Sequence, residues 1–273
     1  MDTPQIAAFA AKIRLEAVRM IYEGGDGHPG PALSIADIVA VLYGQVLRVN
    51  PAQPDWPDRD RMILSKGHAC PILYAALNET GYFGDRIEHF HLRELGSMFQ
   101  GHPVMQKTPG VDMTSGSLGN GLPIACGMAI AAKIQKKDYR VYVIAGDGEM
   151  QEGVGWEAVM TAAHHKLDNL TLFVDNNGWQ SGGTLNEVAG IDEFEMKFRA
   201  FGWHVISVDG HDHAALLRAV ETAKATSVRP TVILCRCVKG KCLSFMENDN
   251  AWHKKVPTDA EMALAAEELG GVR

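Results

Sequence analysis

Two polar, glycine-containing stretches carry the residues best suited to chemistry in this chain, GDG at 146–148 and NNG at 176–178. Each follows a short apolar run, residues 139–145 and 170–174, of the kind that forms a buried strand. Between the two runs, apolar residues recur at helical spacing, namely Trp156, Val159, Met160, Ala163 and Leu167. A strand–helix–strand unit crosses over with right-handed geometry and brings both strand ends to one edge of a parallel sheet. We therefore expect Asp147 and Asn177 to lie close together.

The oxygen atoms available at these two strand ends suit a magnesium ion that is bound to a diphosphate. Magnesium prefers near-octahedral coordination by oxygen, usually from one or two protein carboxylates together with phosphate and water. Asp147 would supply a carboxylate oxygen and Asn177 an amide oxygen. A bend at Gly178 would turn the carbonyl of Trp179 inward as a third ligand. Gly148 would offer its backbone N–H to a phosphate oxygen.

Each stretch alone is also typical of a tight turn after a strand, and it is their pairing that favours a metal site. That pairing, GDG followed thirty residues later by NN, resembles the thiamine diphosphate motif, and GDGEMQEG resembles the transketolase family in particular. The resemblance implies thiamine diphosphate as cofactor, with Gly148 and Asn177 against its diphosphate. It also implies Mg²⁺, for which Ca²⁺ or Mn²⁺ would substitute, and an α/β fold with a doubly wound, mostly parallel sheet and helices on both faces.

Histidine occurs in three further motifs. Two rigid loops place it between glycine and proline, GHPG around His28 and GHP around His102, and His68 follows a predicted strand over 60–65 in the sequence SKGHA. Taken alone, His28 is also typical of a solvated loop, and His68 of a helix cap. By resemblance to the transketolase family, His28 faces the sugar substrate, His102 lies near the reacting carbons, and His68 contacts the cofactor diphosphate.

A glycine-rich turn, SGSLGNG at 115–121, opens a predicted helix over 122–136 and would present backbone N–H groups to an anion or a ring. This signal is weak by itself, because any tight loop uses such glycines. The transketolase family reads GPLGQG at this place. The resemblance therefore places Gly116, Ser117 and Leu118 along the thiamine, with Ser117 in place of the usual proline.

His253 lies in a polar, irregular segment over 239–257 and resembles the last histidine of the family's pocket, which contacts both cofactor and substrate. Lys254 stands where relatives usually carry glycine. By this resemblance, His28, His102 and His253 would bind substrate oxygens and relay protons near neutral pH. Glu152 matches a glutamate that the family buries at a subunit contact, although an acid at a helix N-terminus is an equally physical interpretation.

The rest of the chain shows an alternation of helical and strand patterns. Helices are expected over 4–22, 35–47 (with Ser34 as N-cap), 71–79, 86–95, 194–201, 212–225 and 258–269, and strands over 203–208 and 231–237. His211 and His213, in a GHDH turn, are expected to be surface or capping groups.

The composition narrows the class of protein. The chain has 46% hydrophobic and 22% charged residues, as in an ordinary soluble globular protein, and its net charge of −7 argues against a nucleic-acid-binding or anionic-membrane surface. Residues 1–20 form a charged amphipathic pattern rather than a signal peptide, and no apolar run is long enough to cross a bilayer. Five cysteines fit a reducing compartment, and Cys235, Cys237 and Cys242 lack the companion residues of a zinc site. We expect a cytoplasmic protein.

The resemblance extends over nearly the whole chain, and residues 1–273 are expected to form a single thiamine diphosphate-binding domain. The family activates its cofactor with a glutamate from a second α/β domain, the pyrimidine-binding domain, which we expect to be absent here. The resemblance thus implies the N-terminal subunit of a split transketolase, active only with a C-terminal partner subunit, in a heterotetramer. The pair would transfer a two-carbon ketol unit from a ketose or ketose phosphate to an aldose.

Other functions stay open. The chain could be a non-catalytic cofactor-binding subunit, or the equivalent domain of a deoxyxylulose-phosphate synthase or of a 2-oxoacid dehydrogenase. The series GHPG, SKGHA and GHP favours transketolase over both of these enzymes. The presence of Asp147, Asn177 and all four pocket histidines argues against a loss of catalysis. The donor and acceptor sugars, whether phosphorylated, sulfonated or branched, are not determined by these patterns.

Overall fold

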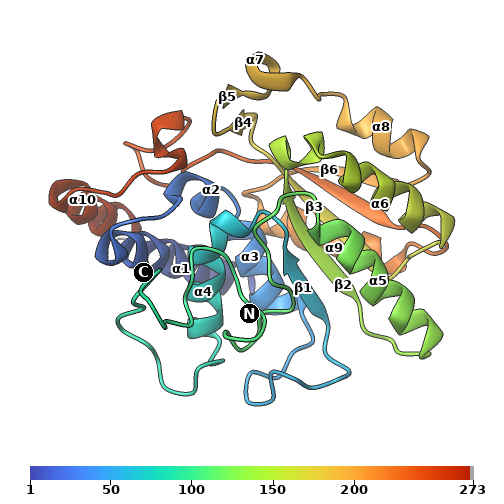
Figure 1. Cartoon of the computed structure of the whole chain (residues 1–273), viewed down its shortest axis with the longest axis horizontal. Helices are drawn as coiled ribbons and strands as arrows, with labels where there is room; N and C mark the ends of the chain where they lie inside the picture. The colour runs from blue at the N-terminus through green and yellow to red at the C-terminus, as the bar shows by residue number, and fades with distance from the viewer. Residues whose placement is uncertain (271–273) are drawn as a thin grey trace.

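Five parallel strands form the central sheet of the protein, whose computed structural model describes residues 1–270 (Figure 1). In spatial order the strands are β1 (Arg61–Leu64), β2 (Val141–Gly146), β3 (Leu170–Asn176), β7 (Thr231–Arg236) and β6 (His204–Asp209). Strands β2 and β3 are buried along almost their whole length because helices cover both faces of the sheet. This confirms the doubly wound α/β fold predicted from the sequence.

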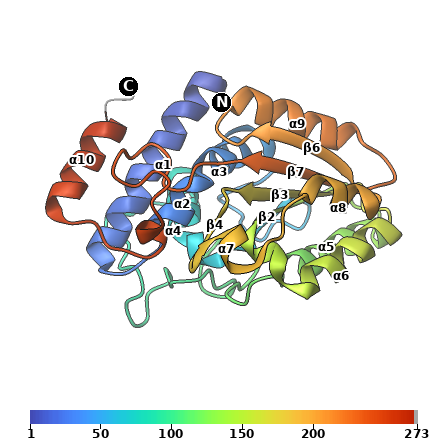
Figure 2. The same ribbon diagram turned by 90° about the horizontal axis from the view of Figure 1, so that it is seen from above.

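Two layers of helices enclose the sheet (Figure 2). One layer holds α1 (Thr3–Gly24), α3 (Ala36–Val41), α4 (Cys70–Glu79) and α9 (His213–Ala225), and the other holds α5 (Gly121–Ile134), α6 (Gly153–His164) and α8 (Phe194–Ala200). Successive residues of each strand point into opposite layers. Tyr142 and Ile144 belong to the hydrophobic core of the first layer, whereas Val141 and Val143 belong to that of the second.

Local capping signals set the ends of the longer helices. Helix α1 begins at a capping box, in which the Asp2 carboxylate accepts the backbone N–H of Gln5 (2.9 Å) and the Gln5 side chain accepts that of Asp2 (2.8 Å). A matching box between Thr258 and Glu261 begins α10 (Asp259–Gly270), which packs against α1. The helix predicted over 35–47 is divided between α3, which ends at Val41, and the π-helical turn (Leu42–Val46) that follows it. Apart from this helix and the segment 86–95, the predicted helices begin and end within two residues of the observed bounds.

Short elements make up most of the remaining structure at the carboxyl edge of the sheet. They are α2 (Pro29–Ser34), the 3₁₀ turns Gly67–Ala69, Gly148–Gln151 and Asn250–His253, the two-stranded β4 (Trp179–Gln180) and β5 (Gly183–Thr184), and α7 (Leu185–Ala189). The π-helical turn instead continues α3 towards the amino edge, where the backbone N–H of Arg48 donates to Asp60 (2.9 Å), directly before β1. The sequence did not predict α2, α7 or the β4–β5 pair. None of the helices within residues 1–270 is both long and apolar enough to cross a membrane.

The helix predicted over 86–95 is wrong, because this segment forms a succession of turns. His91 and Arg93 have φ of +47° and +65°, which a right-handed helix excludes. The side chain of Asn78 holds the segment by accepting the backbone N–H of Ile87 (2.8 Å) and donating to its carbonyl (3.0 Å). Phe90 is buried nonetheless, so the apolar residues of this segment reach the core without a helix.

Ser34 is not the N-cap that the sequence predicted. The GHPG loop leads directly into α2, which begins at Pro29. A proline is tolerated at this position because the first N–H groups of a helix have no acceptor within the helix. Ser34 is the last residue of that helix, and its hydroxyl donates a hydrogen bond to Asp175 (2.7 Å). The loop and its helix are thereby attached to the end of β3.

The GHDH turn was predicted to carry surface or capping histidines, and this is also wrong. His211 and His213, with side chains only 14% and 12% exposed, contact the two carboxylate oxygens of buried Asp37 at 2.7 and 2.8 Å, and Arg14 pairs with the same carboxylate. Burial raises the pKa of Asp37, but Arg14 and the two imidazoles hold it well below its usual range. His211 Nε2 also accepts the backbone N–H of Val238 (2.8 Å), which joins α1 and α3 to the chain after β7.

Candidate active site

A cavity of about 360 Å³ opens at the carboxyl edge of the sheet, where ligands bind in open α/β folds. It collects most of the site residues predicted from the sequence: His28, His68, His102, Gly116, Leu118, Asp147, Gly148, Asn177, Trp179 and His253. Ser117 is exposed and does not line the cavity, and its hydroxyl instead accepts a hydrogen bond from Asn120 (3.0 Å).

The two polar strand ends meet at the base of this cavity. Residues Ala145 and Gly146 of β2 pair in register with Val174 and Asp175 of β3, which brings the following turns together. The Asp147 carboxylate accepts the backbone N–H groups of Gly148 (2.7 Å) and Gly178 (2.6 Å). Gly178 has φ of +79°, a conformation that favours glycine and turns the chain back over Asp147.

Asn177 is oriented by its own neighbours. Its side-chain oxygen accepts the backbone N–H of Trp179 (2.9 Å), and its amide nitrogen donates to Asp175 (2.9 Å) and to the Ser34 hydroxyl (3.2 Å). Asp147, Asn177 and Trp179 thus line the same part of the cavity and come from the ends of two adjacent strands.

The charge balance around Asp147 fits a bound cation. Burial and the nearby carboxylate of Asp175 raise the pKa of Asp147 to about 7, although the N–H groups of Gly178 and Gly148 act in the opposite direction. A cation would relieve this cost, and the oxygens of a carboxylate, an amide and a backbone carbonyl are the ligand types that Mg²⁺ prefers. Within residues 1–270, no three His, Cys, Asp or Glu side chains form a metal cluster, so such a site would be completed by ligand phosphate and water.

Two buried lysines line the same cavity, and the sequence interpretation missed both as site residues. Lys66, from the SKGHA motif, is 3% exposed and pairs with Asp175. Lys239, which follows β7, is 1% exposed and donates to Asn250 (2.6 Å) and to His253 Nδ1 (3.0 Å). Burial and the charge of Lys66 lower the pKa of Lys239 to about 8. Two ammonium groups beside a cation site suit an anionic ligand such as a diphosphate.

The sequence held a signal for these lysines. Lys66 and Lys239 each follow a predicted apolar strand by only a few residues, and this position alone predicts that both lie at the carboxyl edge of the sheet. What the sequence did not reveal is their burial, since a lysine beyond a strand end is usually exposed to solvent.

Three histidine rings form a triangle on one wall of the cavity. The ring centroids of His28, His68 and His253 lie 5.2 to 5.6 Å apart. Burial, together with the charges of Arg93 and Lys254, lowers the pKa of His28 to about 4. Burial and the charge of Lys239 lower the pKa of His253 to about 3. The three imidazoles are therefore neutral at pH 7, because the pKa of His68 is also lowered by burial and by Lys66.

The hydrogen bonds of these rings define their free nitrogens. His253 Nδ1 accepts from the Lys239 ammonium, so a neutral His253 carries its proton on Nε2. His28 Nδ1 is buried and has no hydrogen-bond partner in the described part of the chain. Burial and Arg93 also lower the pKa of His102, which lies beside Gly116 on the opposite loop. The cavity thus offers neutral donors and acceptors to a polar ligand.

Glu149 holds the glycine-rich loop in place and, like the two lysines, was not singled out from the sequence. Its buried carboxylate accepts the backbone N–H groups of Gly119 (2.8 Å) and Gly146 (3.1 Å) and the hydroxyl of Ser65. The Ser65 hydroxyl in turn accepts the N–H of Gly121 (3.1 Å). The ends of β1 and β2 and the start of α5 are thereby tied together.

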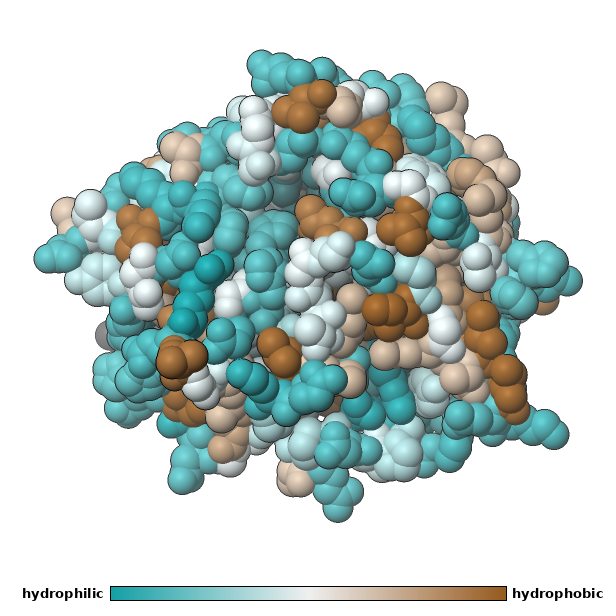
Figure 3. All heavy atoms as spheres, in the orientation of Figure 1, coloured by the Kyte–Doolittle hydropathy of each residue, from teal (hydrophilic) through white to brown (hydrophobic). Residues whose placement is uncertain are grey.

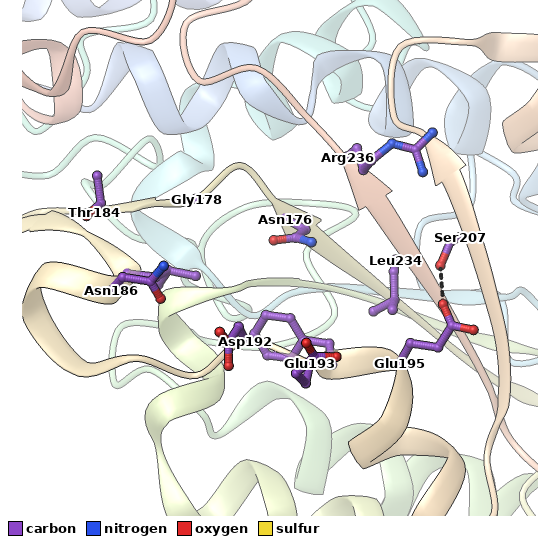
Figure 4. A pocket seen from close by; sticks show the side chains of 12 residues that line it. Asn176, Gly178, Thr184, Asn186, Asp192, Glu193, Glu195, Ser207, Leu234 and Arg236 are labelled. Carbon is purple, nitrogen blue, oxygen red and sulfur yellow. Dashed lines mark hydrogen bonds between the residues drawn. The ribbon is translucent and has the colours of Figure 1, made fainter.

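Another hollow, of about 340 Å³, lies beside the ends of β3, β6 and β7 (Figure 4). Its acidic residues Asp192, Glu193 and Glu195 are exposed, and Glu195 accepts a hydrogen bond from Ser207 (3.3 Å). None of its side chains combines deep burial with a polar atom left without a partner in residues 1–270. The histidine-lined cavity is therefore the candidate active site.

Comparisons with known proteins agree with this assignment. Residues 6–272 match the family model of transketolase, thiamine diphosphate binding domain. A 6-deoxy-6-sulfo-D-fructose transketolase subunit of Clostridium sp. (strain MSTE9) is 41% identical, over 98% of this chain and 96% of that protein. An apulose-4-phosphate transketolase subunit of Phocaeicola vulgatus is 36% identical, over 98% of this chain and 95% of that protein. The transketolase structure from Campylobacter jejuni has a TM-score of 0.92 and 33% identity, over 99% of this chain and 43% of that chain.

The parallel sheet, with Asp147, Asn177 and two buried lysines at its carboxyl edge, is typical of a cofactor-binding α/β domain. The chain belongs to the transketolase family, whose thiamine diphosphate-binding domain it matches over residues 6–272. It spans nearly the full length of the two subunit relatives but only 40% of human transketolase, to which it is 40% identical.

Proposed function

We propose that this chain is the N-terminal, cofactor-binding subunit of a two-chain transketolase. The pair would transfer a two-carbon ketol unit from a ketose or ketose phosphate to an aldose. The observation that carries the proposal is the convergence of His28, His68, His102 and His253 on one cavity beside Asp147 and Asn177. A cation–diphosphate site next to several neutral imidazoles suits a reaction in which protons move on sugar hydroxyls.

The proposed cofactor contacts follow the layout of the cavity. Asp147, Asn177 and the Trp179 carbonyl would hold Mg²⁺, with Ca²⁺ or Mn²⁺ as substitutes. The diphosphate would lie against Gly148, Asn177 and His68, with the ammonium groups of Lys66 and Lys239 supplying positive charge. Gly116, Ser117 and Leu118 would follow the thiamine. Thiamine diphosphate, when bound, supplies the nucleophilic carbon and the electron sink for breaking and forming the carbon–carbon bond.

The neutral histidines would orient the sugar and move protons on its oxygens. His253 would donate from Nε2, because Lys239 fixes its tautomer. His28 Nδ1, which no residue within 1–270 satisfies, would accept from or donate to a substrate hydroxyl according to its tautomer. His102, on the loop beside Gly116, would act on the oxygens nearest the reacting carbons. General acid–base groups of this kind contribute about 100-fold or more to a rate.

We also propose that activity depends on a C-terminal partner subunit, which would bring the pyrimidine-binding domain and the activating glutamate. Two relatives that match the chain almost end to end are named as transketolase subunits, which supports this. Glu152, at the mouth of the cavity, is exposed. Hydrophobic side chains also gather over the α5 and α6 side, including Ile124, Ile134 and Met160 at 41%, 76% and 50% exposure (Figure 3). Such a surface suits burial in an assembly, which we propose to be a heterotetramer.

In this proposal, residues 1–273 act as one cofactor domain in the cytoplasm, and sugars are the ligands rather than nucleic acid or membrane. The net charge of −7 and five free cysteines support those assignments. The two subunit relatives are named for a sulfonated and a phosphorylated sugar, so we propose an anionic ketose or ketose phosphate as donor.

The test combines the purified chain, its partner subunit, thiamine diphosphate and Mg²⁺ with a panel of ketose donors and aldose acceptors. We expect ketol transfer by the pair and none by either chain alone. Turnover by this chain in the verified absence of a second polypeptide would refute the two-chain proposal. Cofactor binding without any transfer by the pair would instead indicate a non-catalytic binding subunit, and decarboxylation of a 2-oxoacid a different class of enzyme.

A further inference from the structure

A small charge cluster, Asp26, Arg93 and Lys254, lies beside the cavity residue His28, and we name it the rim. Its three residues border the cavity without being among the residues that line it. Arg93 Nη1 lies 3.0 Å from one oxygen of the Asp26 carboxylate, and Lys254 Nζ lies 3.4 Å from the other. Two cations share one anion, so the rim has a net positive charge although the chain as a whole carries −7. A local positive charge in an acidic protein attracts and holds an anionic ligand.

The two cations keep hydrogen-bonding capacity for a ligand. In the described part of the chain, Asp26 is the only acidic partner of Lys254, whose side chain is 55% exposed. The Nε of Arg93 is buried and has no hydrogen-bond partner among residues 1–270. The exposed ammonium of Lys254 is therefore available to an oxyanion, and the partly exposed guanidinium of Arg93 lies on the other side of the same carboxylate.

The position of the rim relates it to the sugar rather than to the diphosphate. The Arg93 guanidinium lies against Gly101, directly before His102, and leaves no room for a side chain there. The charges of Arg93 and Lys254 lower the pKa of His28, which follows Asp26 by two residues. The cation site at Asp147 is instead surrounded by Lys66 and Asp175.

Lys255, the residue after Lys254, contacts other groups. The ammonium of Lys255 lies 3.8 Å above the ring of Trp252 and 3.1 Å from Glu261 at the start of α10. Lys254 and Lys255 therefore have the same charge and adjacent backbone positions, but only Lys254 contacts Asp26. The sequence provides a matched control.

We propose that Lys254, together with Arg93, binds the anionic group at the far end of the sugar substrate and makes the enzyme prefer charged over neutral ketoses. This inference rests on the proposed function. A phosphate and a sulfonate share the tetrahedral oxyanion that two such cations recognise. Asp26 competes with the substrate for the same cations and moderates their affinity. Lys254 is a specificity residue of this chain, at a position where the family usually has glycine.

The experiment uses the complete two-subunit enzyme with cofactor and Mg²⁺. The kcat/KM is measured for a ketose phosphate, a sulfonated ketose and a neutral ketose. We expect Lys254→Met to lower kcat/KM about tenfold for the better charged donor, as for loss of one charge-assisted hydrogen bond, and to leave the neutral donor within about twofold. Lys254→Arg should retain the preference, and Lys255→Met should change neither value. If Lys254→Met lowers kcat/KM more for the ketose phosphate, the group bound is a phosphate; if it lowers kcat/KM more for the sulfonated ketose, the group is a sulfonate.

A second variant is expected to have the opposite effect on the charged donor. Asp26→Asn removes the competing carboxylate and should lower the KM for the charged donor while the neutral donor is unaffected. If Lys254→Met reduces charged and neutral donors alike, or reduces neither, the inference is overturned and Lys254 has no role in selectivity. If the wild-type pair converts no ketose at all, charged or neutral, it is the proposed function that fails, and this inference fails with it.

Discussion

The base of the cavity and its rim are built in different ways. At the base, Lys66, Asp147 and Asp175 are at most 3% exposed and lie at or just beyond the carboxyl ends of β1, β2 and β3. The three charged residues of the rim come from loops and have side chains 29% to 55% exposed. Strand register fixes the base, whereas the loops of the rim are free to vary. From this comparison we predict that cofactor binding and substrate selectivity depend on separate parts of the structure.

The largest effect should follow from breaking the buried ion pair at the base. Lys66→Met leaves the Asp175 carboxylate buried without its counter-charge, and we expect the free energy of unfolding to fall by about 3 kcal/mol or more. Urea denaturation of the purified chain measures this loss. The double variant Lys66→Met/Asp175→Asn should recover part of it, because no unpaired charge remains. An unchanged denaturation midpoint in the single variant would show that this pair does not stabilise the fold.

A smaller but more specific effect is expected at the cation site. Asp147→Ala removes a carboxylate oxygen, and the affinity for thiamine diphosphate in the presence of Mg²⁺ should fall by about 100-fold or more. Calorimetric titration with the partner subunit present measures it. Asp192→Ala, in the hollow of Figure 4, removes the same kind of side chain from an exposed loop and should leave the titration unchanged. Equal binding by both variants would reject Asp147 as a metal ligand.

Away from both regions, the cap of α10 should affect stability alone. Thr258→Ala removes the hydroxyl that accepts the N–H of Glu261 (3.3 Å), and a lost cap costs about 1 kcal/mol. Thermal denaturation should show a lower midpoint, while the cofactor affinity measured above stays the same. A fall in cofactor affinity would mean that α10 supports the cavity directly.

The last effect appears only at acid pH and concerns His28 and His253. The folded-state pKa values of His28 and His253, about 4 and about 3, lie below the usual value of about 6.5. The unfolded chain therefore binds more protons below about pH 6.5, and stability should decline from there towards pH 4. The variant His28→Gln/His253→Gln should lose less stability over this range in urea denaturation, whereas exposed His89→Gln should follow the wild type. Parallel curves for all three would contradict these shifts.

The base could be predicted from the sequence and the rim could not, for a physical reason. Apolar runs that end in GDG and NNG predict adjacent strand ends, because a right-handed crossover permits essentially one arrangement. No such rule determines the segment 86–95, where turns with positive φ at His91 and Arg93 stand in place of the predicted helix and the Arg93 guanidinium lies against Gly101, next to His102.

Interactions distant in sequence account for the other differences. Lys239 is buried through contacts with Asn250 and His253. His211 and His213 are drawn inward by Asp37, which lies more than 170 residues earlier in the chain. Local pattern assigns a residue to a helix, strand or loop, but partners of this kind are selected only when the chain has folded.

The bond from Val238 to His211 has a consequence for the order of events in binding. His211 Nε2 accepts the N–H of Val238, and Asp37 holds the opposite nitrogen of the ring, so the imidazole is committed to one tautomer. This hydrogen bond fixes the backbone directly before Lys239, whose side chain lines the cavity before any coenzyme binds. An arriving diphosphate would meet a preorganised ammonium group, and no entropy would be spent on ordering that part of the chain.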